Sequence, residues 1–206
     1  MIVAMTAGLL TGLSLILAIG AQNAYVLRQG LLRSHVGAVV LVCALSDAVL
    51  IVAGVAGIGT LVDRAGWVLE VVRWLGVAFL LGYAAASLRR AAGSETLAAD
   101  AGGTEPLRPV LVRVVALTWL NPHVYLDTVL LLGSIAAAHD GGGPAGRWWF
   151  AAGACVASVL WFTSLGYGAR LLAPLLARPR AWQVLDVLVA VTMVFVAANL
   201  ALGRAG

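Results

Sequence analysis

The chain has 206 residues, of which 62% are hydrophobic and 11% are charged. A soluble globular domain is nearer half apolar and a quarter charged, so this composition excludes a soluble protein and leaves no room for a folded domain outside a membrane. The thirteen basic residues are all arginine and form no tract typical of nucleic-acid binding, so the net charge of +4 is informative about membrane topology instead.

Six mainly apolar stretches follow one another along the chain. Each is long enough to cross a bilayer as a helix, because a span needs about 20 residues. The first has no basic leader or cleavage site and is interpreted as a retained span, not as a signal peptide. We therefore expect an all-α membrane protein with six transmembrane helices near residues 3–27, 36–62, 67–88, 110–137, 147–173 and 181–203.

The first span is interrupted near its end by Gly20-Ala21-Gln22-Asn23. Glycine is a weak helix former, and two amide side chains follow it. A break in the helix, with polar groups beside it, is expected there.

Two spans carry a carboxylate: Asp47 lies in the second and Asp127 in the fourth. A charged side chain at the bilayer centre costs about 2.5–3.5 kcal/mol, so such a residue faces a cavity or a partner. One interpretation is that each aspartate pairs with a cation elsewhere in the bundle. No arginine lies near the middle of a span, however, which favours two buried carboxylates in a site for a cationic ligand, for protons, or for both in turn.

The fourth span is broken at Leu120-Asn121-Pro122-His123, because Pro122 has no N–H and clashes with the carbonyl near Thr118. Freed carbonyls there could accept hydrogen bonds from an ammonium group. The start of the second half-helix could bind a carboxylate. His123 could relay protons, or it could have a packing role.

Other polar residues in the spans have simpler interpretations. We expect Asp186 to form an interfacial ion pair with Arg180, and Asn199 to bond across helices. Cys43 and Cys155 stand at comparable places in the second and fifth spans, as a transmembrane thiol–disulfide carrier would require, but both also suit packing.

No pair of His or Cys residues has metal-ligand spacing, and no phosphate-binding loop is present. We therefore expect no metal, no cofactor and no enzymatic activity. A divalent-cation exporter would also use buried acids and stays an alternative.

Nine of the thirteen arginines lie in or beside the first, third and fifth connections. Since basic residues concentrate on the cytoplasmic side, those connections are predicted to be cytoplasmic and both termini to lie outside.

An internal repeat is also visible. Residues 22–27 align with 122–127, and Gly57-Ile58-Gly59 resembles Gly166-Tyr167-Gly168, although matches this short can arise by chance. A duplication predicts a first three-helix repeat (1–90), a polar linker (91–109) and a second repeat (110–206). With three spans each, the repeats would be inverted, as is common in secondary transporters.

Several segments resemble the signatures of the lysine/arginine exporter (LysE) family. The similar segments are Gly12–Ile16, Ala18–Asn23, Val26–Gly30, Ser46-Asp47, Thr118–Thr128 and Leu165–Arg170. The related homoserine and threonine exporters carry Pro-Gly-Pro where this chain has Gly20-Ala21-Gln22.

The resemblance implies export of L-lysine or L-arginine across the bacterial cytoplasmic (inner) membrane, driven by ion gradients or antiport, by a homodimer. The residues that match the family's two kinks and intramembrane acids, and so are the candidates for substrate binding, are Gln22, Asn23, Asp47, Asn121, Pro122 and Asp127. Asp47, Asp127 and His123 are the candidates for proton coupling.

Our hypothesis for the cycle is alternating access, with the α-carboxylate bound at the fourth-span half-helix. The cationic side chain of the substrate would bind Asp47 or Asp127.

Overall fold

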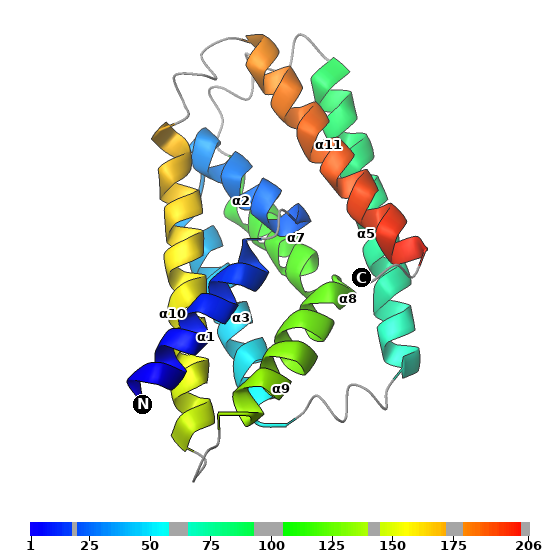
Figure 1. Ribbon diagram of the computed structural model, residues 1–206. Helices are drawn as coiled ribbons and strands as arrows, with labels where there is room; N and C mark the ends of the chain where they lie inside the picture. Colours follow the sequence, from blue (N-terminus) through cyan, green and yellow to red (C-terminus); the bar gives the residue numbers. More distant parts are fainter. Residues whose placement is uncertain (18–19, 58–65, 93–104, 140–144, 172–178, 203–206) are drawn as a thin grey trace.

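The computed structural model describes residues 1–17, 20–57, 66–92, 105–139, 145–171 and 179–202. Over these residues the chain is helical and contains no strand, as the composition predicts (Figure 1). The helices are α1 (Ile2–Ile16), α2 (Ala21–Leu32), α3 (Val36–Val55), α5 (Gly66–Ala92), α7 (Leu107–Trp119), α8 (Pro122–Val124), the π-helix η1 (Tyr125–Leu131), α9 (Leu132–Ala137), α10 (Ala145–Gly168) and α11 (Pro179–Ala201).

Four helical stretches are long and apolar enough to cross a bilayer: Val36–Val55, Glu70–Arg89, Ala145–Leu171 and Gln183–Ala201. The pair α1 and α2, bent by 85°, would make a fifth. The predicted fourth span is divided, because α7 ends at Trp119 and a new helix begins at Pro122. The described residues thus contain four or five candidate spans, and six inverted spans stay a prediction.

Helix α2 extends beyond the predicted end of the first span and includes Arg28 and Gln29. Both are buried, and the Arg28 guanidinium pairs with Asp186 of α11 at an Nε–Oδ1 distance of 3.4 Å. Arg28 directly follows the predicted first span, which ends at residue 27, and was therefore counted among the arginines of the first connection; that assignment is wrong, because Arg28 lies within α2. Asp186 is 2% exposed and lies inside the bundle, while the side chain of Arg180, its expected partner, lies outside the described residues.

Polar contacts join the helix ends at one end of the bundle. Helix α2 ends at Arg33, and α3 begins after His35. The imidazole Nε2 of His35 lies 2.8 Å from the Glu105 carbonyl oxygen, and the Glu105 carboxylate pairs with Arg113 of α7 at 2.6 Å. We call this end, where α2 ends and α3 and α7 begin, the Arg33 face.

Close packing through glycines positions the helices. Helix α1 lies along α10, and a Cβ on Gly8 would overlap the Phe150 carbonyl. Helix α3 also packs on α10. Helices α5 and α11 run side by side and antiparallel, and they touch the other helices less extensively than they touch each other (Figure 1).

Some predicted features lie outside the described residues. These are most of the 91–109 linker (93–104), the repeat positions Ile58 and Gly59, and the connection arginines Arg64 and Arg178.

Candidate functional site

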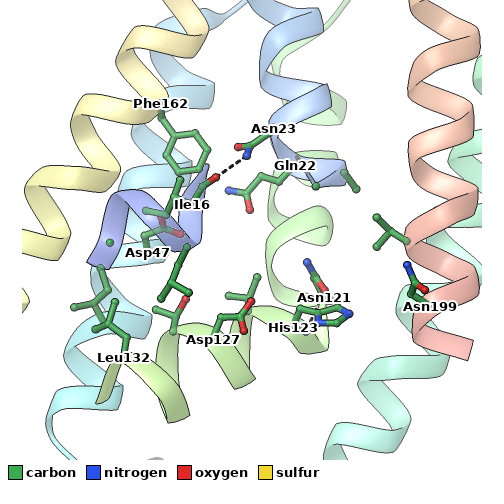
Figure 2. A pocket seen from close by; sticks show the side chains of 18 residues that line it. Ile16, Gln22, Asn23, Asp47, Asn121, His123, Asp127, Leu132, Phe162 and Asn199 are labelled. Atoms are coloured by element: carbon green, nitrogen blue, oxygen red, sulfur yellow. Dashed lines mark hydrogen bonds between the residues drawn. The ribbon is translucent and has the colours of Figure 1, made fainter. Parts of the chain in front are cut away.

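A cavity of about 260 Å³ lies where the two broken spans meet α3, α10 and α11 (Figure 2). Its lining includes Gln22, Asn23, Asp47, Asn121, His123 and Asp127. Polar residues from the first, second and fourth predicted spans thus face one space. Pro122 supplies backbone at the start of α8, while its side chain lies outside the described residues.

Asp47 is held in the wall of the cavity by a neighbouring helix. Its side chain is buried, and its Oδ2 accepts a 2.7 Å hydrogen bond from the Ser158 hydroxyl of α10. Ser158 is itself fully buried. The hydroxyl supplies a dipole but no charge, so a cation entering the cavity could still pair with the carboxylate.

Asp127 lies on η1 and also lines the cavity, but its side chain is exposed. The expectation of two buried carboxylates is therefore correct only for Asp47. The break before Pro122 and the wider π-helix that follows give this segment a separate course from α7. Single-turn π segments within helices are frequent at functional sites.

The break in the first span is closed by Asn23. Gly20 precedes α2 in an extended conformation, and the Asn23 Nδ2 donates a 2.8 Å hydrogen bond to the Ile16 carbonyl at the end of α1. The Trp161 indole donates to Asn23 Oδ1 at 3.2 Å. Gln22 lies beside it on the cavity wall, and its Nε2 is buried without a hydrogen bond to the described residues.

The break in the fourth span is closed in a similar way. The Tyr125 hydroxyl donates a 2.8 Å hydrogen bond to the Trp119 carbonyl at the end of α7. Asn121 Oδ1 accepts from the His123 N–H at 3.2 Å and so caps α8. Two of the groups that this break was expected to offer a ligand are thus already hydrogen-bonded, the Trp119 carbonyl by Tyr125 and the His123 N–H by Asn121, while substrate binding at the break stays a prediction.

Three further residues shape the site without having been predicted there. Phe162 of α10 and Asn199 of α11 line the cavity, with Asn199 on the opposite side from Gln22 (Figure 2). Ser158, which does not line the cavity, fixes Asp47 through its hydrogen bond. A hydroxyl or amide in an apolar run was a usable signal for Ser158 and Asn199, but only the helix arrangement reveals what each one faces.

The described residues contain no group of three His, Cys, Asp or Glu side chains that could hold a metal ion. Cys43 is buried in α3 and Cys155 is half-buried in α10, and both are free thiols.

Comparison with known proteins gives consistent matches over nearly the whole chain. Residues 13–204 match the family described as LysE type translocator. The chain is 38% identical to the lysine exporter LysE of Corynebacterium efficiens, over 95% of this chain and 96% of that protein. It is 42% identical to the arginine exporter protein ArgO of an Enterobacter species (94% and 91% covered) and 44% identical to ArgO of Yersinia enterocolitica (91% and 91%). No solved structure matches the chain.

Proposed function

Because the chain belongs to the LysE type translocator family, we propose that it is a secondary transporter that exports basic L-amino acids, lysine or arginine or both, from the bacterial cytoplasm. The observation that carries the proposal is the cavity that Asp47 and Asp127 share between two broken helices. A carboxylate can neutralise the ammonium or guanidinium group of such a substrate. The relatives named lysine exporter and arginine exporter support the same substrate class.

In this proposal the chain forms two inverted three-helix repeats, residues 1–90 and 110–206, in the cytoplasmic membrane. Related contacts support the repeat. Helix α2 crosses α10 where Gly30 meets the Gly166 carbonyl, and α9 crosses α3 where Gly133 meets the Gly54 carbonyl. The last helices of the two halves, α5 and α11, pair with each other, as equivalent elements about a two-fold axis would.

The substrate would lie across the cavity, with its side-chain cation at Asp47 or Asp127. The α-carboxylate would bind at the start of α2 and not at the start of α8, where the sequence-based hypothesis placed it. Asn121 occupies the N-terminus of α8, whereas the first turn of α2 has no side-chain cap and carries the Gln22 amide on the cavity wall. Backbone N–H groups and the positive end of the helix dipole favour an anion there.

Transport would proceed by alternating access, coupled to the proton motive force or to antiport. One of the two carboxylates would be protonated or ion-bound on the return step, with His123 as a possible relay. A homodimer, with both termini outside, completes the proposal.

The test is efflux from cells fed a lysine- or arginine-containing dipeptide, timed with and without an uncoupler. Asp47→Asn and Asp127→Asn should each lose export, because removing one member of a charge pair costs about 2–5 kcal/mol of binding. Glu70→Gln is the matched control, since that carboxylate is exposed on α5 away from the cavity. Normal export by both folded aspartate variants would refute the site.

A further inference from the structure

Helix α2 continues past the cavity with a row of buried polar groups. Gln22, Tyr25 and Gln29 are spaced i, i+3, i+7 and therefore share one face of the helix. The cavity ends on α2 at Gln22 and Asn23, so Tyr25 and Gln29 lie beyond it toward the Arg33 face. Tyr25 is 0% exposed and Gln29 is 1% exposed.

The polar atoms of this row are poorly satisfied. Gln22 Nε2, Tyr25 OH and Gln29 Oε1 are buried and make no hydrogen bond with the described residues. The Cys43 thiol lies near Gln22, and the Arg113 guanidinium, whose Nη1 pairs with Glu105, lies near Tyr25. Burying one such atom costs about 1–3 kcal/mol, and native proteins contain few of them. Three on one helix face need a reason other than packing.

Side chains from α5 and α11 contact α2 at the row and beside it. The Tyr25 ring meets the Tyr83 ring edge-on, with centroids 5.8 Å apart. Arg28 reaches from α2 to Asp186 of α11 at 3.4 Å. Tyr25, in the middle of the row, therefore contacts α5, and the neighbouring Arg28 contacts α11; these two helices form the pair that packs less extensively on the remaining helices.

We propose that the Gln22–Tyr25–Gln29 face of α2 is the closed half of the translocation pathway, which receives the basic amino acid when the α5–α11 pair separates from α2. This inference rests on the proposed function and extends it from the cavity to the Arg33 face. The amide oxygen of Gln29 and the hydroxyl of Tyr25 would then hydrogen-bond water or the ammonium and guanidinium groups of the passing substrate. The cavity and the row would be open in turn, never together.

The experiment measures the access of a thiol reagent to α2. The only two cysteines, Cys43 and Cys155, are replaced by alanine, or by serine where export requires it, and Gln29→Cys is introduced. Val26→Cys is the matched control, because Val26 is also 1% exposed but packs toward Gly166 of α10. Arg33→Cys, at an exposed position, marks the Arg33 face.

A membrane-impermeant maleimide is applied to vesicles of each orientation, with and without lysine or arginine. Gln29→Cys should be labelled from the face that labels Arg33→Cys, about tenfold faster than Val26→Cys, because a minor open state exposes only the polar face. Added substrate should change the rate of labelling at Gln29→Cys alone. Absence of labelling in a variant that still exports would overturn the inference.

A second variant does not depend on labelling. Gln29→Leu keeps a similar volume and removes the unpaired oxygen, so its melting temperature should be unchanged or higher while export slows about tenfold. A purely structural Gln29 would instead lose stability and keep its export rate per folded molecule.

The two proposals fail in different ways. Labelling of Gln29→Cys from the Arg33 face, without any efflux of lysine or arginine, would leave the pathway standing and refute the substrate. Efflux of lysine or arginine by a Gln29→Cys variant that the reagent does not label would support the substrate and refute the pathway.

Discussion

Among the residues that the structure describes, Ser158 alone donates a side-chain hydrogen bond to the Asp47 carboxylate. Ser158→Ala should lower the free energy of unfolding by about 1–3 kcal/mol, because it leaves a buried acceptor without its donor. Export should fall as well, since Asp47 loses its fixed orientation. Ser164→Ala, at an exposed position on the same helix, should change neither quantity. Thermal unfolding of the purified protein and cellular efflux measure the two effects, and equal behaviour of the two variants would contradict this role for Ser158.

The ion pair between Arg28 and Asp186 joins α2 to α11 away from solvent. Arg28→Gln or Asp186→Asn alone should cost about 3–5 kcal/mol of stability, because each removes one member of a buried ion pair. The double variant should recover part of that loss, and a double-mutant cycle measures the coupling.

The exposed pair of Arg73 and Glu70 on α5 provides the comparison, with an Nη1–Oε2 distance of 3.0 Å. Glu70→Gln should cost less than about 1 kcal/mol, as surface pairs generally do. A cost as large as that of Asp186→Asn would contradict the difference that we attribute to burial.

Among single residues, the sequence identified polar side chains that are unusual in apolar spans, but it did not identify the partners with which buried side chains pair. Asp47, Gln22 and Asn121 stand out because polar groups are rare in apolar spans, and all three line the cavity. Arg28 looked like a loop residue because its partner, Asp186, is 158 residues away along the chain. No local sequence pattern reveals that two residues so far apart along the chain lie side by side in space.

Among the helices, the crossing of α3 with η1 and α9 sets the separation of the two aspartates. A Cβ on Gly54 would lie 2.7 Å from the Val129 carbonyl oxygen, closer than real Cβ atoms approach. Gly54→Ala should push η1 away from α3, cost about 1–3 kcal/mol of stability and reduce export.

Gly82→Ala on α5 is the control, because a Cβ there would meet nothing within 4 Å. This variant should keep its export rate, and its stability should be unchanged or higher by about 0.5–1 kcal/mol, because alanine is more favourable than glycine in a helix interior. Melting temperature and efflux distinguish the two variants. An equally small effect of Gly54→Ala and Gly82→Ala would refute the role of the crossing in setting the separation of the two aspartates.

Breaks in the helices were predictable, but their consequences were not. Pro122 and Gly20 mark the two interruptions by their own backbone properties. The hydrogen bonds that close them come from Asn23 and Tyr125, each reaching back to the preceding half-helix. Because these side chains satisfy the carbonyls locally, the break does not leave the acceptors that simple removal of an N–H suggests.

On the scale of the whole molecule, helix direction alternates so that the Arg33 face and the start of α5 lie at opposite ends (Figure 1). The arginine distribution predicts that the Arg33 face is cytoplasmic. In a cysteine-free background, Arg33→Cys should be labelled by an impermeant maleimide only from the cytoplasmic side. Trp67→Cys, at a position that is 75% exposed, should be labelled only from outside. Labelling of both from one side would refute the alternation, and exchanged sides would refute the orientation.

Composition alone was sufficient to predict a helical membrane protein, because scarce charge and long apolar runs leave few other solutions. It did not predict that α5 and α11 would pair closely with each other and more loosely with the rest. Leucine, valine and alanine suit lipid and helix contacts equally well, so apolar runs do not encode which helices meet.

Among the described residues, α11 supplies only Val196 and Asn199 to the cavity, whereas the aspartates and the helix breaks come from other helices. In the proposed function, charge recognition and this wall of the cavity therefore belong to different parts of the chain. Substitutions confined to α11 would then change the shape of one wall of the cavity without replacing either aspartate. Under the proposed function, a laboratory library that varies α11 alone therefore tests whether this wall decides between lysine and arginine.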